Sequence, residues 1–121
     1  GMADSIPVKR FEKMGYQKNV VILTQPLDYI KEKNSALPLI KLIYRKYPKL
    51  IEVMKNRHVL YNETTEYIKE KEKSGDVLVI RPDKKLPVNH VEHDAEKLEQ
   101  AYQDGRAAGC KYLEKVKEFI K

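Results

Sequence analysis

The chain has 121 residues, of which 41% are apolar and 35% are charged. This composition excludes an intrinsically disordered chain, and the length allows one domain or part of one. The 24 Lys and Arg residues outnumber the 18 Asp and Glu residues, giving a net charge of +6, and the single cysteine excludes an internal disulfide framework and a zinc site built from several cysteines.

Apolar runs in the sequence contain four residues or fewer, whereas a membrane-spanning helix needs about twenty apolar residues in succession. The charged residues Lys9, Arg10 and Glu12 interrupt the pattern of a signal peptide. We therefore expect a cytoplasmic protein that can also lie at the periphery of a membrane.

The N-terminal part of the chain is predicted to form a short helix and a strand. The helix is expected over residues 5–15, with Asp4 or Ser5 capping its first amides and Gly15 providing a left-handed stop. Residues 19–24 contain four consecutive apolar residues, mostly β-branched, which indicates a strand buried on both faces, as in the interior of a parallel sheet.

The rest of the chain is predicted to be mainly helical. Gly105 and Gly109 each cost about 1 kcal/mol in a helix interior, so we expect another element to pack closely against them. In chain order, the sequence predicts a loop over 25–36, helices over 37–47 and 48–73, a second buried strand over 76–82 and a last helix over 94–120.

The two predicted strands are too few for a stable sheet. A helical connection of about fifty residues separates them, so they should be parallel. An isolated pair is marginal in water, and its two apolar edges would invite aggregation. We therefore expect that the strands pair with a second copy or belong to a larger sheet.

Several segments resemble patatin-like phospholipases, in the order in which that family carries them. Residues 2–10 (MADSIPVKR) are similar to the stretch after the catalytic aspartate motif, and residues 20–26 (VVILTQP) to the next strand. Residues 79–82 (VIRP), followed by 86–88 (LPV), resemble a later strand. The final helix is similar to the C-terminal helix of bacterial members at Leu98, Tyr102, Gly105 and Gly109.

The resemblance implies an α/β fold with two parallel strands and long helices, forming a fragment of a larger three-layer patatin-like sheet with a helical C-terminal extension. Residues 1–36 would be the end of the catalytic core, and residues 37–121 the extension of helices and a strand. The family hydrolyses lipid acyl esters with a Ser–Asp dyad. The chain would then be the C-terminal segment of such a hydrolase, and the missing N-terminal part its partner.

The catalytic parts of that family are incomplete in this sequence. None of the three serines, Ser5, Ser35 and Ser74, lies in Gly-x-Ser-x-Gly, and the five glycines form no glycine-rich oxyanion loop. Gly1 is either the last glycine of the Asp-Gly-Gly motif or a cloning remnant, and the aspartate is absent in both cases. We therefore assign no catalytic residue, cofactor or metal ligand, and expect the chain to be inactive alone.

Individual polar residues have two interpretations each. Asp4 is a helix cap or, less favoured, a substitute base. His90 and His93 lie beside acidic residues in a polar loop, but a metal site needs three or four ligands in fixed geometry, so solvated loop residues are favoured. Cys110 has no base near it in sequence, which favours a structural or exposed thiol over a nucleophile.

Residues 41–49 form the most concentrated cationic and aromatic segment. A solvated helix face is the favoured interpretation of this segment, and a contact for anionic lipid or for nucleic acid is the alternative. The resemblance favours lipid over nucleic acid, because the family's substrates lie in membranes. The expected lipid contacts are Lys41, Tyr44, Arg45, Lys46, Tyr47 and Lys49.

A second hypothesis treats the chain as a stand-alone interaction or regulatory module. Such a module would self-associate through the open edges of its strands and bind an anionic surface. The coding sequence upstream of Gly1 distinguishes the two hypotheses, because only the hydrolase requires the serine and aspartate motifs there.

Overall fold

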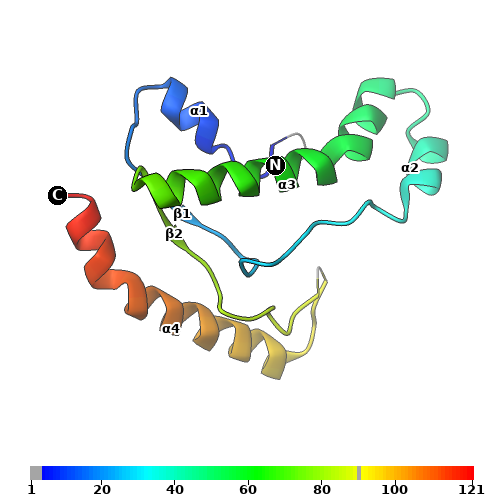
Figure 1. Cartoon of the computed structure of the whole chain (residues 1–121). Coiled ribbons are helices and arrows are strands. Elements are labelled where there is room, and N and C mark those ends of the chain that lie inside the picture. The colour runs from blue at the N-terminus through cyan, green and yellow to red at the C-terminus, as the bar shows by residue number, and fades with distance from the viewer. Residues whose placement is uncertain (1–3, 90) are drawn as a thin grey trace.

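The structure of the chain is a computed structural model that describes residues 4–89 and 91–121. It has a mixed α/β fold in which long helices surround two short strands (Figure 1), as the sequence predicts. The elements are α1 (Val8–Lys13), β1 (Asn19–Ile22), α2 (Leu37–Ile43), α3 (Pro48–Ser74), β2 (Val77–Ile80) and α4 (Ala95–Phe119).

The two strands are parallel, which confirms the prediction made from the long connection between them. Asn19 lies opposite Val77, and Ile22 lies opposite Ile80. The amide of Leu23 donates to the carbonyl of Ile80 at 2.8 Å and extends the pairing by one residue. In Figure 1, α3 lies on one side of the strands and α4 on the other, so β2 is covered on both faces.

The core lies between α3 and one face of the sheet. Ile68 of α3 is 1% exposed and Val79 of β2 is 0% exposed, and both pack with Val77 and with Val8 of α1. Burial of such aliphatic side chains stabilises a fold by about 1.5–3 kcal/mol each. The half-buried residues Ile6, Val21, Leu23 and Tyr67 surround this cluster.

The prediction that both strands are buried on both faces is correct for β2 and wrong for β1. The two valines of β2 are buried and its other two residues are half-buried. In β1, by contrast, Val20 is 37% exposed and Ile22 is 73% exposed. The physical reason is that α4 contacts β2 on this face and leaves these β1 side chains in solvent.

The last helix, α4, packs through only part of its apolar surface. No residue of the helix is buried, and an added Cβ at Gly105 or Gly109 would meet no atom within 4 Å. The close packing expected at these glycines is therefore not found within the described chain. The large exposed apolar side chains of the helix, called here the outer stripe, are Leu98, Tyr102, Leu113 and Ile120.

The predicted N-terminal caps of the first helix are wrong, whereas the left-handed stop predicted at Gly15 is confirmed by its φ of +98°. The helix begins at Val8, after Pro7, and no side chain caps it. The Asp4 carboxylate accepts a hydrogen bond from the amide of Ile6 at 3.1 Å instead, before the helix starts. Asp favours such local turns, because its short side chain reaches the amide two residues further on.

The helix predicted over 37–47 also ends early, at Ile43. The amide of Tyr44 still donates to the carbonyl of Ile40, and a turn then leads into α3. The long helix α3 agrees with its predicted bounds to within one residue, because Pro48 occupies its first turn and Gly75 ends it.

Gly75 joins α3 to β2 with a φ of +82°, in the left-handed region that costs other residues about 1–2 kcal/mol. We predict that Gly75→Ala lowers the free energy of unfolding by about 1 kcal/mol. Gly105→Ala is the matched control and should raise it by roughly 0.5–1 kcal/mol, because this glycine lies in a helix with open space around it. Urea denaturation followed by circular dichroism measures both, and a neutral Gly75→Ala change would contradict the assigned role of the turn.

Candidate functional site

The residues predicted to contact lipid lie together where α2 meets the start of α3. We call residues 37–49 the α2 corner. Every residue from 41 to 49 is exposed. Leu37 is 4% exposed and lies at the start of α2, which contacts α3, but the other apolar side chains of α2 mostly face solvent. The exposed fractions are 57% for Leu39, 69% for Leu42 and 62% for Ile43.

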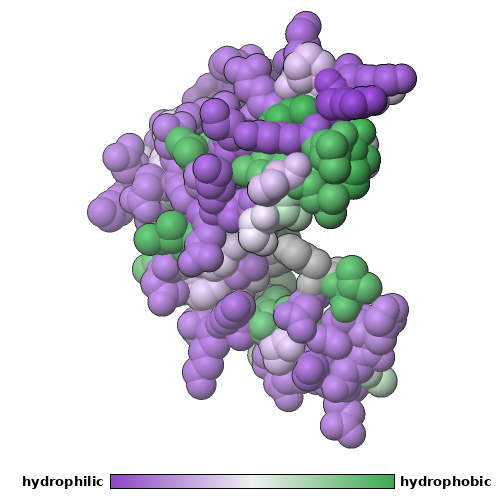
Figure 2. All heavy atoms as spheres, turned by 90° about the vertical axis from the view of Figure 1, so that its right-hand side faces the viewer, coloured by the Kyte–Doolittle hydropathy of each residue, from purple (hydrophilic) through white to green (hydrophobic). Residues whose placement is uncertain are grey.

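The charge of the α2 corner is entirely positive. No Asp or Glu occurs between Glu32 and Glu52. None of the ion pairs in the described part of the chain involves a cation of the corner. Figure 2 views the molecule from the side on which α2 lies, and hydrophobic side chains gather in its upper part next to hydrophilic ones. The corner therefore combines exposed aliphatic side chains with unpaired cations.

A cleft of about 560 Å³ opens between residues 29–35, which lead toward α2, and the side of α3. We call it the cation cleft. Its lining includes a single carboxylate, that of Glu32, among the residues that the structure describes. The basic residues of its lining are Lys31, Lys33, Arg57, His58 and Lys85.

Lys31 is fixed in the cation cleft by its backbone. The side-chain amide of Asn62 accepts from the Lys31 amide at 2.8 Å and donates to the Lys31 carbonyl at 3.0 Å. The ammonium group of Lys31 lies 5.2 Å from the centre of the Tyr61 ring, in the range of a cation–π contact. Tyr29 packs edge-on against the same ring. The loop is thus attached to α3 at this point.

The side chains that line the cation cleft carry a net positive charge. Partial burial, and next the nearby charge of Arg57, lower the pKa of Lys31. Two nitrogen atoms of neighbouring α3 residues, Arg57 Nε and His58 Nδ1, are buried without a hydrogen-bond partner in the described structure. Buried polar atoms ordinarily have partners, so these two are exceptions that need a cause.

Sequence reasoning did not find the cation cleft. Its charged residues come from three segments that are far apart in the chain, and each looks like part of a solvated surface when it is considered alone. The Asn62 contacts that position Lys31 span 31 residues and leave no periodic signal.

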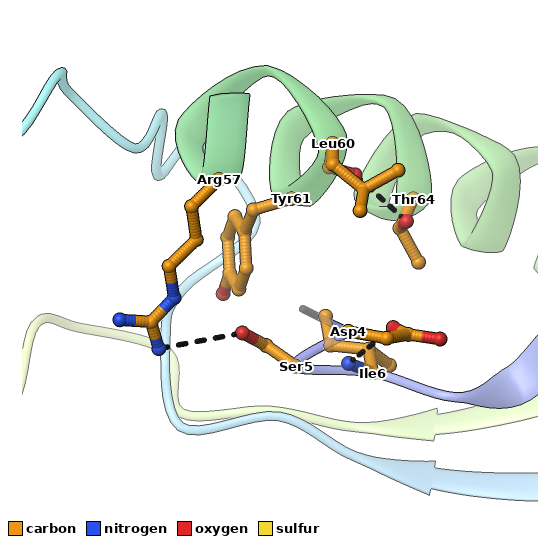
Figure 3. Close-up of a pocket in the computed structure, with 7 residues that line it drawn as sticks. All are labelled: Asp4, Ser5, Ile6, Arg57, Leu60, Tyr61 and Thr64. Carbon is orange, nitrogen blue, oxygen red and sulfur yellow. Dashed lines mark hydrogen bonds between the residues drawn. The ribbon is translucent and has the colours of Figure 1, made fainter. Parts of the chain in front are cut away.

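Arg57 also lines a small cavity on its other side, shown in Figure 3. Its guanidinium donates to the Ser5 hydroxyl at 3.5 Å, and the Asp4 carboxylate lies nearby, bonded to the amide of Ile6. A guanidinium stays protonated and cannot accept the proton of a serine nucleophile. The contact therefore joins the N-terminal loop to α3 and gives Ser5 no catalytic role.

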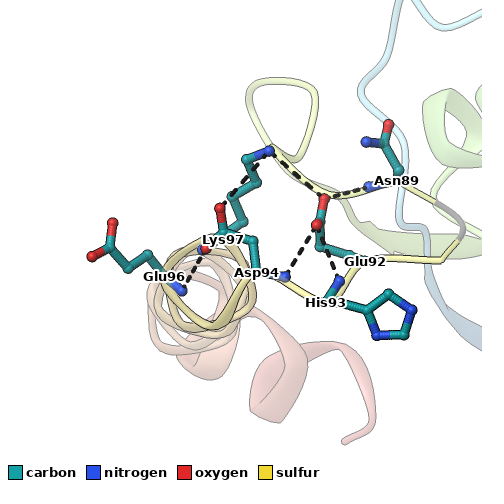
Figure 4. A network of polar contacts seen from close by, with 6 residues as sticks. All are labelled: Asn89, Glu92, His93, Asp94, Glu96 and Lys97. Atoms are coloured by element: carbon teal, nitrogen blue, oxygen red, sulfur yellow. Dashed lines mark hydrogen bonds and ion pairs between the residues drawn. The ribbon is translucent and has the colours of Figure 1, made fainter.

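The acidic residues of the loop before α4 have structural roles. Glu92 accepts hydrogen bonds from three backbone amides, including that of Asp94 at 3.2 Å (Figure 4). These contacts, led by the Asp94 amide, hold the pKa of Glu92 below its ordinary value. Asp94 in turn caps α4 by accepting from the amides of Glu96 and Lys97.

The described residues contain no group of three or more His, Cys, Asp and Glu side chains that could hold a metal ion. His93 is exposed, and His90 lies outside the described residues. Cys110 is exposed on α4. Among the helices that the structure describes, none is long and apolar enough to cross a bilayer.

The comparisons with known proteins identify one family. A family model described as "Domain of unknown function (DUF6363)" matches residues 47–121, which hold α3, β2 and α4. The chain belongs to this family. No curated protein and no solved structure matches the chain.

Proposed function

We propose that the chain is the C-terminal segment of a patatin-like serine lipid acyl hydrolase and is inactive alone. The observation that carries the proposal is the incomplete sheet. Each strand has one hydrogen-bonded neighbour in the described structure, and Val20 and Ile22 of β1 are exposed. Parallel sheets are normally covered on both faces and extended by further strands. The resemblance of residues 2–10, 20–26 and 79–82 to that family identifies the sheet to which the strands would belong.

In the parent hydrolase, the segment would hold the loop that follows the catalytic aspartate. That loop corresponds by resemblance to residues 4–6, which Arg57 attaches to α3 through Ser5 (Figure 3). The missing N-terminal part would supply the nucleophilic serine, the aspartate and the oxyanion loop. The function of this chain is then structural, because it completes the sheet and fixes one side of the active site. The division at residue 36 stays a prediction.

The same proposal assigns lipid contact to the α2 corner. Basic residues near an anionic membrane surface each contribute about 1 kcal/mol of attraction, and exposed aliphatic side chains can enter the boundary with the acyl chains. Nucleic acid is less favoured, because phosphate contacts would use the lysines and leave Leu42 and Ile43 exposed.

The open edges of the sheet also favour a second candidate function, a stand-alone module that self-associates through β1 or β2. A second copy of the chain would then pair with the open strand edge and extend the sheet without the missing N-terminal part. An open reading frame with Gly-x-Ser-x-Gly and Asp-Gly upstream of Gly1 would favour the hydrolase, and a start codon at Met2 would favour the module.

We predict that the 121-residue chain does not hydrolyse p-nitrophenyl butyrate above the buffer rate. A chain extended by its natural upstream sequence should hydrolyse the ester, and a serine-reactive phosphonate should abolish this activity. If the 121-residue chain hydrolysed the ester and the phosphonate abolished this hydrolysis, the expectation that the chain is inactive alone would be refuted. An extended chain without activity would refute the hydrolase assignment.

We predict that the chain floats with phosphatidylcholine vesicles containing about one third phosphatidylglycerol, and much less with pure phosphatidylcholine. The double variant Leu42→Ser/Ile43→Ser should lower the partition coefficient roughly tenfold, because two exposed aliphatic side chains are lost. The matched control is Leu98→Ser/Leu113→Ser on the outer stripe of α4, which should bind unchanged. Equal losses in the two double variants would contradict the assignment to the α2 corner.

A further inference from the structure

We propose that the cation cleft is a binding site for a phosphate group, either inorganic phosphate or the phosphate of a phosphomonoester. This inference goes beyond the proposed function and does not depend on it. It rests on three observations about the residues that line the cleft: their charge, the unpartnered atoms among them and the rigid placement of Lys31.

The charge of the cleft favours an anion, because its lining carries four Lys and Arg residues and one carboxylate. Lys31, Arg57 and Lys85 come from three different segments and take part in none of the ion pairs of the described structure. Elsewhere, Lys71, Lys111 and Lys117 each have a carboxylate within 4.0 Å. The one carboxylate in the lining, that of Glu32, belongs to an exposed residue and leaves the balance positive.

Two buried nitrogen atoms of the lining lack a hydrogen-bond partner in the described structure. Arg57 donates through one guanidinium nitrogen to Ser5, while its Nε has no partner. Nδ1 of the next residue, His58, is also buried without a partner. A phosphate offers several acceptor oxygens, so it can bond to the guanidinium group of Arg57 and to a lysine at the same time, while Arg57 Nε and His58 Nδ1 themselves are shielded from solvent.

The placement of Lys31 shows that the positive charge is built into the fold. Asn62 fixes the backbone of Lys31 on both sides, and Tyr61 holds its ammonium group. Burial of this cation, and next its closeness to Arg57, lower the pKa of Lys31. A bound dianion would reverse this effect and raise the pKa of Lys31 again.

The size and composition of the cleft favour phosphate over larger or simpler anions. A volume of about 560 Å³ lies in the range of small-ligand sites and cannot admit a nucleic-acid duplex. Guanidinium and ammonium groups together are typical of phosphate recognition, because arginine binds two oxygens and lysine acts as a point charge. Residues 29–35 lead into α2, so the phosphate can belong to a soluble phosphomonoester or to a lipid headgroup.

Calorimetric titration of the 121-residue chain with inorganic phosphate and with glycerol 3-phosphate tests this proposal. Both should bind saturably at one site, and Arg57→Gln and Lys31→Gln should each weaken binding roughly tenfold. Lys85 is exposed, so Lys85→Gln should fold normally. It should weaken phosphate binding, and it keeps the test valid if the other two variants fail to fold. The matched control is Lys115→Gln, which removes the same charge from an exposed position of α4, away from the cleft lining, and should bind unchanged.

Two further measurements separate the possible results. The pKa of the Lys31 side chain, measured by NMR titration, should rise when phosphate is bound. The pKa of a lysine that only stabilises the fold should not change. Vesicles that contain phosphatidic acid compete with glycerol 3-phosphate if the site accepts lipid headgroups, and they do not compete if it is restricted to soluble phosphomonoesters. No saturable binding of either phosphate probe, or an equal loss in Lys115→Gln, would overturn the proposal.

Discussion

A strand of a parallel sheet needs a hydrogen-bonded neighbour on each side and apolar cover on each face, and this chain meets that requirement only in part. β2 has a neighbour on one side and helices over both faces, and its valines are 2% and 0% exposed. β1 has β2 as its one hydrogen-bonded neighbour in the described structure but lacks cover on one face, where Ile22 is 73% exposed. The described core is correspondingly small, and the rest of the described structure is arranged around a sheet of two strands.

The uncovered apolar surfaces differ in their charge, and this difference separates their proposed roles. The outer stripe of α4 lies among residues of both signs, as the pair of Lys117 with Glu114 illustrates. Such a surface suits a protein neighbour or water. The α2 corner has only cations around Leu39, Leu42 and Ile43, which suits an anionic lipid surface. The cation cleft beside it is concave and lined mainly by polar and basic residues, and it therefore suits a small anion.

The local structure of this chain could be predicted from its sequence, because local rules determine it. Pro48 and Gly75 mark the ends of α3, and two runs of four apolar residues mark the strands. The burial of those elements could not be predicted in the same way. Apolar runs in the sequence predict burial, but in the described residues Leu42 and Ile43 of α2 and Ile22 of β1 are exposed.

The cation cleft illustrates what sequence patterns cannot show. Lys31, Arg57 and Lys85 become neighbours only because the crossover through α3 brings three segments together, and because Asn62 attaches the first segment to the helix. The cap assigned to Asp4 was wrong for a different reason. Pro7 moves the start of the helix to Val8, and the Asp4 side chain then finds a nearer amide at Ile6.

The central claim is that the outer edge of β1 lacks its natural neighbour, and amide hydrogen exchange tests it most directly. The amides of Asn19 and Leu23 bond to the β2 side, so those of Val20 and Ile22 point to the open edge by the alternation of a strand. In the monomeric 121-residue chain, we expect the Leu23 amide to be protected and the Val20 and Ile22 amides to exchange freely. In the upstream-extended chain, all three should be protected. Equal protection of all three in the monomeric 121-residue chain would contradict the claim, because the chain would then cover its own edge.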